Sequence, residues 1–148
     1  MDTFNLICLD SPESTKQWLK DRYSLHSFDH AYKLLRANFN SDNSETYLKE
    51  SILMNPDMHK ILMIERDTRK LAGIAVVKER RENGNNLLEL HYFTVARKSC
   101  GDGARLMALL LQWASRKKFY SEIVAMADLN VVRFFYQNEF VLVDPKEF

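Results

Sequence analysis

Two glycines one residue apart, Gly101 and Gly103, mark the stretch of this sequence best suited to binding an anion. They follow an apolar-rich run at residues 87–95 and precede a strongly apolar, helix-like run at residues 104–113. A strand, a glycine loop and a helix start, in that order, direct free backbone N–H groups and the positive end of a helix dipole at an anion. The pattern predicts a loop that holds a phosphate-bearing cofactor. The alternative is a plain strand-to-helix connection in which glycine only provides the turn.

The cysteines and histidines give weaker evidence of a functional site. Cys8 and Cys100 are the only cysteines and lie far apart, so we expect neither a disulfide framework nor a zinc site, and a reducing compartment fits best. Cys100 precedes the predicted helix, where a thiol pKa can be lowered, but inert filling of the loop is the simpler interpretation. His26 and His30 have a helical metal-binding spacing, yet no third ligand is apparent, and we predict no metal.

Composition indicates one globular domain over residues 1–148, since 46% of the residues are hydrophobic and 28% are charged. The formal net charge of +1 argues against nucleic-acid binding, which depends on many basic contacts. The longest apolar runs are far shorter than a bilayer span, and the N-terminus lacks the signature of a signal peptide. We therefore expect an intracellular protein, cytoplasmic or nuclear, that does not act at a membrane.

Hydrophobic periodicity predicts a mixed α/β fold. Ser11 and Pro12 mark a helix start, and Asp42 with Glu45 resembles a capping box. The charged segment 79–86 is interpreted as a connection that ends in a turn. We expect strands over 4–9, 60–65, 71–78, 87–95, 122–127 and 140–143, and helices over 12–23, 28–39, 44–54, 103–117 and 130–138. This order combines an antiparallel meander with a βαβ unit around the glycine loop.

The loop and its surroundings resemble the GNAT superfamily of acetyl-CoA-dependent N-acetyltransferases. The phosphate-loop pattern of that superfamily is Arg/Gln-x-x-Gly-x-Gly/Ala, and residues 98–103 read Lys-Ser-Cys-Gly-Asp-Gly. Within the superfamily the sequence is most similar to histone acetyltransferases of the general-control transcription coactivator type. That likeness spans roughly residues 47–140 and is carried by the strand Glu-Leu-His-Tyr-Phe-Thr-Val at 89–95, by Gly-x-x-Leu-Met from Gly103, and by the ungapped stretch 127–140.

The resemblance implies the GNAT fold, acetyl-CoA as acetyl donor and a set of residues that hold it. The backbones of Phe93, Thr94 and Val95 would hold the pantetheine arm and the acetyl carbonyl. The remaining cofactor-binding candidates are Lys98, Ser99, Cys100, Gly101, Asp102, Gly103 and Ala104 in the phosphate loop, and Asp128, Phe134 and Phe135 downstream. Asp102 opposes this role, because a carboxylate beside a diphosphate is unfavourable unless its side chain points to water.

Catalysis by direct attack needs a group that takes the proton of the amine. Glu89 is the candidate general base, because a carboxylate in a largely apolar strand can have its pKa raised toward neutrality. The alternative is an ordinary solvent-facing Glu. Tyr136 is the candidate general acid for the leaving thiolate, although counting back from Phe140 places Phe135 at the usual tyrosine position, which favours packing. His91 could relay a proton or be an ordinary strand residue.

The chain departs from the family pattern in three places. The loop before Gly101 is about two residues short, Val131 and Glu139 replace small residues, and the chain ends eight residues after Phe140, so the C-terminal strand is expected to be shortened. The basic groups at 80–81 and 116–118 are interpreted as solvated surface.

We therefore predict an N-acetyltransferase that transfers acetyl to an amine, with a protein or peptide lysine as the first candidate acceptor. The reaction would take place in a ternary complex. The alternatives are an acetyltransferase of a small-molecule amine and a non-catalytic GNAT-fold module that binds CoA or a partner. In that last case a second copy or a partner chain would complete the sheet edge.

Overall fold

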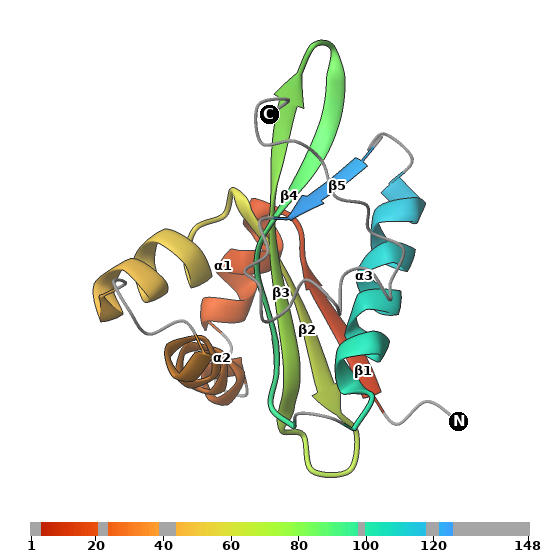
Figure 1. The fold of residues 1–148 in the computed structure, drawn as a ribbon. Coiled ribbons are helices and arrows are strands. Elements are labelled where there is room, and N and C mark those ends of the chain that lie inside the picture. The colour runs from red at the N-terminus through yellow and green to blue at the C-terminus, as the bar shows by residue number, and fades with distance from the viewer. Residues whose placement is uncertain (1–3, 21–23, 39–43, 98–99, 118–121, 126–148) are drawn as a thin grey trace.

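The computed structural model describes residues 4–20, 24–38, 44–97, 100–117 and 122–125 (Figure 1). Its elements follow the predicted order. They are strand β1 (Phe4–Leu9), helices α1 (Pro12–Lys20) and α2 (Ser24–Asn38), the π-helix η1 (Tyr47–Leu53), strands β2 (Met58–Glu65), β3 (Leu71–Glu82) and β4 (Asn85–Val95), helix α3 (Asp102–Lys117) and strand β5 (Glu122–Ala125). The predictions for 126–127, 130–138 and 140–143 lie outside the described residues.

The strands form one five-stranded sheet in the order β1-β2-β3-β4-β5. The first four strands pair antiparallel as a meander, and β5 adds to β4 in parallel after the crossover through α3. The predicted meander followed by a βαβ unit is confirmed, and so is the α/β class.

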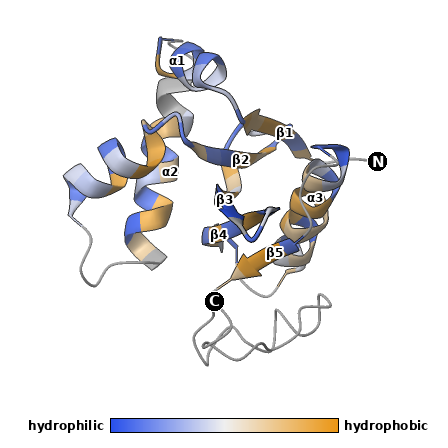
Figure 2. Ribbon diagram, turned by 90° about the horizontal axis from the view of Figure 1, so that it is seen from above, coloured by the Kyte–Doolittle hydropathy of each residue, from blue (hydrophilic) through white to orange (hydrophobic). Residues whose placement is uncertain are grey.

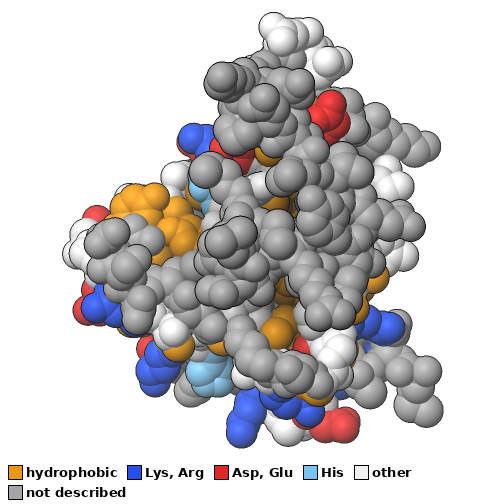
Figure 3. All heavy atoms as spheres, in the orientation of Figure 1, with side chains coloured by type: hydrophobic (Ala, Val, Ile, Leu, Met, Phe, Trp, Pro, Cys, Tyr) orange, Lys and Arg blue, Asp and Glu red, His pale blue; other side chains and the backbone are white. Residues whose placement is uncertain are grey.

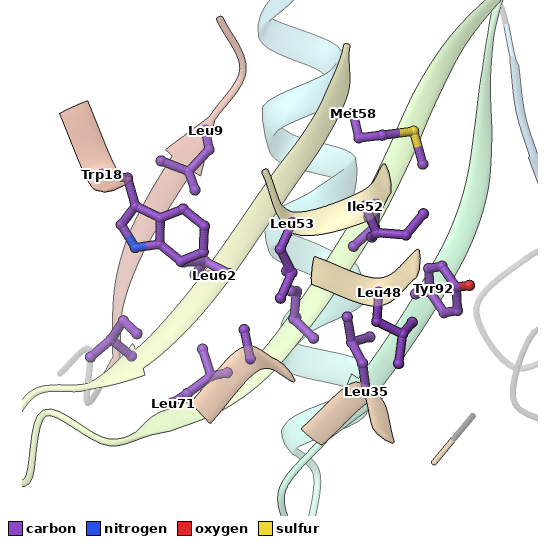
Figure 4. Close-up of a cluster of buried hydrophobic side chains, with 14 residues drawn as sticks. Leu9, Trp18, Leu35, Leu48, Ile52, Leu53, Met58, Leu62, Leu71 and Tyr92 are labelled. Atoms are coloured by element: carbon purple, nitrogen blue, oxygen red, sulfur yellow. The ribbon is translucent and has the colours of Figure 1, made fainter. Parts of the chain in front are cut away.

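Helices cover both faces of the sheet, and each face has its own apolar cluster. Viewed from above, the strands run between α3 on one side and α2 on the other (Figure 2). The α3 cluster contains Leu88 and Leu90 of β4 with Leu106, Met107 and Leu110 of α3. The opposite cluster, which we call the η1 cluster, joins α1, α2 and η1 to the other face of the sheet (Figure 4). It includes Trp18, Leu35, Leu48, Ile52, Leu62 and Tyr92.

The first helix begins where the sequence predicts it. The Ser11 hydroxyl accepts a hydrogen bond from the Ser14 N–H at 3.1 Å, and the Ser14 hydroxyl accepts one from the Ser11 N–H at 3.1 Å. This reciprocal pair satisfies two backbone donors at the start of α1. At the third helix the predicted cap Asp42 lies outside the described residues, and the Ser44 hydroxyl accepts from the Tyr47 N–H at 3.1 Å.

Two predictions about this part of the chain are wrong. The charged segment 79–86 does not leave the sheet, because β3 continues to Glu82 and β4 starts at Asn85. The turn between them is Asn83-Gly84, with φ values of 52° and 81°. Positive φ at both central residues is what a tight two-residue hairpin requires. The helix predicted over 44–54 is a π-helix over most of its length, so its backbone is wound more widely than periodicity suggests.

None of the helices in the described ranges is both long and apolar enough to span a bilayer.

Lys60 is a charged side chain inside the core. Its side chain is fully buried on β2, and its ammonium donates to Thr15 Oγ1 at 3.2 Å and to the Asn55 carbonyl at 2.8 Å. Both acceptors are neutral, so they offset the loss of hydration only in part. Burial accordingly lowers the pKa of Lys60 to about 8.

This burial predicts a pH-dependent stability. The unfolded chain holds the Lys60 proton more tightly than the native state, so the free energy of unfolding should rise by about 1 kcal/mol between pH 7 and pH 9. Urea unfolding at both pH values measures the rise. Lys60→Met, which has no ionisable group at this position, should lack it. An equal pH dependence in the two proteins would contradict the prediction.

Gly73 of β3 lies where the sheet and α3 approach closely, so a larger side chain has little room there. A Cβ at this position would lie 3.1 Å from Leu106 Cδ2, 3.1 Å from Val95 Cγ1 and 3.2 Å from the Thr94 carbonyl oxygen. Gly73→Val should therefore lose about 1–3 kcal/mol of unfolding free energy, as overpacked cores do. Chemical denaturation measures it, with Ala108→Val on the exposed side of α3 as the control. A Gly73→Val protein as stable as the control would show that the helix can move away freely.

Candidate functional site

Strand β5, as far as it is described, pairs with the first half of β4. Their parallel pairing runs from Leu87 opposite Glu122 to Leu90 opposite Ala125, where the described part of β5 ends. Strand β4 continues to Val95 and stays paired with β3 as far as Gly73. The second half of β4 therefore extends past the described part of β5 and leads toward the start of α3.

A β-bulge lies in β4, next to the last residue that pairs with the described part of β5. Val76 and Val77 are consecutive on β3, but they pair with Tyr92 and Leu90, so His91 is the extra residue of β4. The bulge reverses which face each following side chain occupies. Leu88 and Leu90 lie in the α3 cluster, whereas Tyr92 lies in the η1 cluster. Regular alternation would have placed all three on one face.

Glu89 and His91 meet on the face opposite α3. Arg80 Nη1 donates to Glu89 Oε1 at 2.9 Å, and Glu89 Oε2 lies 3.1 Å from His91 Nε2. The register explains the first contact, because Lys78 lies opposite Glu89 and Arg80 is the next residue on the same face of β3. Glu89 is half-buried, with 28% of its side chain exposed. We call this set of three side chains the Arg80–Glu89–His91 group.

The pKa of Glu89 corrects the sequence prediction. Burial raises it, but the hydrogen bond and charge of Arg80 and the contact with His91 outweigh burial and hold the pKa below the usual range of a glutamate. The expected shift toward neutrality was therefore wrong, because the sequence did not reveal that a cation lies beside the carboxylate. The interpretation of 80–81 as solvated surface is also wrong for Arg80, which is half-buried in this contact.

The glycine loop joins β4 to α3 at the far end of the same strand. The Ala96 N–H donates to the Ala72 carbonyl at 2.8 Å, and the Arg105 N–H donates to the Gly101 carbonyl at 3.1 Å. Gly101 has φ of +87°, so the predicted glycine turn is confirmed, and no atom lies within 4 Å of where its Cβ would be. Helix α3 starts at Asp102, one residue earlier than predicted. This open backbone at a helix N-terminus suits a diphosphate.

The Asp102 side chain does not point to water. It is buried, and its Oδ2 accepts a hydrogen bond from Arg97 Nε at 3.2 Å. The contact neutralises the carboxylate whose charge would oppose a diphosphate. Arg97 remains 63% exposed at the loop, and Cys100 and Ala104 are exposed as well. The charge and access of the loop are therefore compatible with an anionic ligand.

The other cofactor candidates divide into described and undescribed residues. Phe93, Thr94 and Val95 follow the bulge on β4, with Thr94 and Val95 buried and Phe93 half-buried. Gly103 lies in the first turn of α3. Lys98, Ser99, Asp128, Phe134, Phe135 and Tyr136 lie outside the described residues. The described candidates thus gather along one line, from Glu89 through the second half of β4 to the start of α3.

A separate hollow lies near the opposite end of α3. Its volume is about 360 Å³, and His59 and Glu79 line it with the segments at 10–12 and 56–57 and with Lys78. His59 Nε2 lies 3.3 Å from Glu79 Oε1, and its ring contacts Trp113. Within the described ranges no three His, Cys, Asp or Glu side chains are grouped as metal ligands. This hollow contains none of the predicted site residues.

Comparison with known proteins finds likeness in structure but not in sequence. No protein-family model and no curated protein sequence matches the chain significantly. Among solved structures, an aminoglycoside acetyltransferase from an uncultured soil metagenomic sample superposes with a TM-score of 0.67 at 14% identity, covering 96% of this chain and 91% of that one.

Two further structures extend the comparison. The ribosomal-protein-alanine N-acetyltransferase of Brucella melitensis biovar Abortus has a TM-score of 0.66 at 14% identity, covering 95% of this chain and 93% of that one. A GNAT family acetyltransferase of Staphylococcus aureus also has a TM-score of 0.66 at 14% identity, covering 97% and 95%. The meander, the parallel fifth strand and these superpositions together show that the chain has the GNAT acetyltransferase fold.

Proposed function

We propose that this protein is an acetyl-CoA-dependent N-acetyltransferase. The observation that carries the proposal is the line of features along β4. The Arg80–Glu89–His91 group with its β-bulge, the second half of β4 and the glycine loop follow one another along the chain. This order suits a long ligand with a reactive end and an anionic end, which describes an acyl-CoA.

The donor would lie along the second half of β4. The first turn of α3 and the open backbone at Gly101 would hold the diphosphate, while Arg97 offsets the charge of Asp102. The backbones of Phe93, Thr94 and Val95 would hold the pantetheine arm and the acetyl carbonyl, as the family resemblance implies. Bound acetyl-CoA supplies an acetyl group activated as a thioester. The chain itself supplies orientation, exclusion of water by the buried Thr94 and Val95, and a proton acceptor.

The acceptor would approach Glu89 and His91 from the face opposite α3. Tyr92, next to the bulge, hydrogen-bonds Tyr47 of η1, so η1 borders this face of the site. Tyr47 and Met54 are exposed, with 42% of each residue accessible. Figure 3 shows hydrophobic side chains gathered at the left, on the side of the molecule where η1 lies.

This apolar border beside a carboxylate and a histidine suits a primary amine on an apolar stem. We keep a protein or peptide lysine as the first acceptor class on this basis and on the sequence likeness to histone acetyltransferases. The structural neighbours that carry the names of aminoglycoside and ribosomal-protein-alanine acetyltransferases make small amines and protein N-termini the other classes for testing.

The donor site predicts stabilisation by CoA. At 100 times its dissociation constant, CoA should raise the free energy of unfolding by about 2.7 kcal/mol. Ala104→Glu places a carboxylate in the exposed first turn of α3, where it favours the helix but repels a diphosphate, so CoA affinity should fall about tenfold. Gln112→Glu adds the same charge two turns further along α3 and should leave the CoA effect unchanged. Thermal unfolding with and without CoA measures both.

The outcomes separate the alternatives. If millimolar CoA does not stabilise the wild type, both the acetyltransferase hypothesis and the CoA-binding-module hypothesis are ruled out. If CoA affinity falls equally in Ala104→Glu and Gln112→Glu, the diphosphate does not bind at the N-terminus of α3. If CoA binds, acetyl transfer is measured to histone-tail peptides, small polyamines and an aminoglycoside. Transfer to none of these amines, with CoA bound, would favour the non-catalytic module.

A further inference from the structure

We propose that His91 removes the proton from the attacking amine, and that Glu89 and Arg80 position it. This inference rests on the proposed acetyl transfer and divides its proton chemistry among the three residues of the group. The evidence is the contact geometry of the two carboxylate oxygens, the location of the bulge and the access to the imidazole.

Both oxygens of Glu89 are already engaged. Oε1 accepts the Arg80 hydrogen bond and Oε2 faces His91 Nε2, which leaves an incoming ammonium no uncontested oxygen. The lowered pKa of Glu89 also makes it a weak proton acceptor. A carboxylate held in this way is better suited to orienting a neighbour than to accepting a proton itself.

His91 has the geometry that the proton acceptor needs. Glu89 Oε2 accepts the Nε2–H of a neutral imidazole, and this fixes the tautomer in which Nδ1 carries the lone pair. The residue is exposed, with 34% of its side chain accessible. It is also the bulge residue, next to Leu90, the last residue of β4 that pairs with the described part of β5. The imidazole therefore stands where an acetyl group held along the rest of β4 would begin.

Among the described residues, the charged groups near His91 come from two strands. Strand β3 contributes Arg80 and Lys78, β4 contributes Glu89, and the residues of β5 opposite this part of β4 are Val124 and Ala125. Tyr92 and Tyr47 lie beyond on the η1 side. Arg80 stays cationic, so Glu89 remains ionised and its contact with His91 persists across the working pH range.

These groups account for every bond and proton in the acetyl-transfer step. The neutral amine nitrogen attacks the acetyl carbonyl carbon, a C–N bond forms, and the C–S bond of the thioester breaks. The proton of the amine moves to His91 Nδ1. The electron pair of the C–S bond leaves with CoA as thiolate, which takes up a proton from solvent or from the imidazolium. No oxidant, reductant or metal takes part.

Kinetics of three variants test the assignment. His91→Gln should lower kcat by about 10²–10⁴-fold, the usual contribution of general base catalysis, and should remove the acidic limb of the kcat/KM pH profile. Glu89→Gln should lower kcat with little change in the KM for acetyl-CoA, while the acidic limb remains because His91 is present. Arg80→Lys retains a donor and should recover most of the kcat that Arg80→Met loses.

Matched controls carry the same chemical changes elsewhere. His30→Gln on α2 and Glu13→Gln on α1 should behave as the wild type. If His91→Gln keeps its acidic limb and Glu89→Gln loses it, Glu89 is the base and the inference is overturned. A wild type that transfers acetyl to no amine overturns the proposed function together with this inference, whereas an active His91→Gln with an unchanged pH profile overturns this inference alone.

A second readout does not depend on turnover. Long-range ¹H–¹⁵N spectra of the histidine rings should show His91 as the Nε2–H tautomer when neutral, with its signal identified by its loss in His91→Gln. Glu89→Gln should mix the two tautomers, since the amide can donate as well as accept. A wild-type His91 found as the Nδ1–H tautomer would contradict the proposal.

Discussion

The one extra residue in β4 is the constraint on which the rest of this site depends. Because side chains alternate along a strand, inserting His91 against consecutive β3 residues exchanges the two faces of everything that follows. Before the bulge Leu90 packs under α3, and after it Tyr92 packs against η1. Removing the bulge would return Tyr92 to the α3 side and pull the strand out of register with both of its apolar clusters.

The α3 cluster positions the glycine loop. The α3 cluster fixes the start of α3 through the close approach of Leu106 to Gly73, and so holds the glycine loop against the end of β4. At the other end of the helix, Asp10 accepts hydrogen bonds from Trp113 Nε1 at 3.0 Å and from Lys117 at 2.7 Å. The helix is thus fixed at both ends, and its N-terminus cannot shift independently of the sheet.

Much of this fold follows from the sequence, because apolar alternation and glycine position act locally. The strands of the meander, the Ser11 cap and the turn at Gly101 are local features of this kind. The contact between Arg80 and Glu89 was missed because it depends on strand register. The Asn83-Gly84 turn carried that information, since a two-residue hairpin there places Lys78 opposite Glu89 and Arg80 diagonal to it.

Other features of the structure left no local pattern in the sequence from which they could be predicted. The bulge lies in a run where apolar residues occupy both parities, so alternation could not locate the extra residue. The burial of Asp102 depends on Arg97 folding back across the loop, and the π-helical winding of η1 depends on packing against α2 and the sheet. The roles of the site residues remain proposals, and Lys98, Ser99, Asp128 and 134–136 lie outside the described residues.

Lys60 has a chemical consequence for a chain proposed to bind a reactive thioester. At pH 7.4 an amine with a pKa of about 8 is roughly one-fifth neutral, whereas an ordinary lysine is neutral in about one molecule in a thousand. Among the described lysines it is the one whose pKa burial lowers, so it is also the one best able to attack an acetyl donor. Its full enclosure by the core prevents that attack. The packing of β2 against α1 therefore keeps this amine out of reach of a thioester in solution.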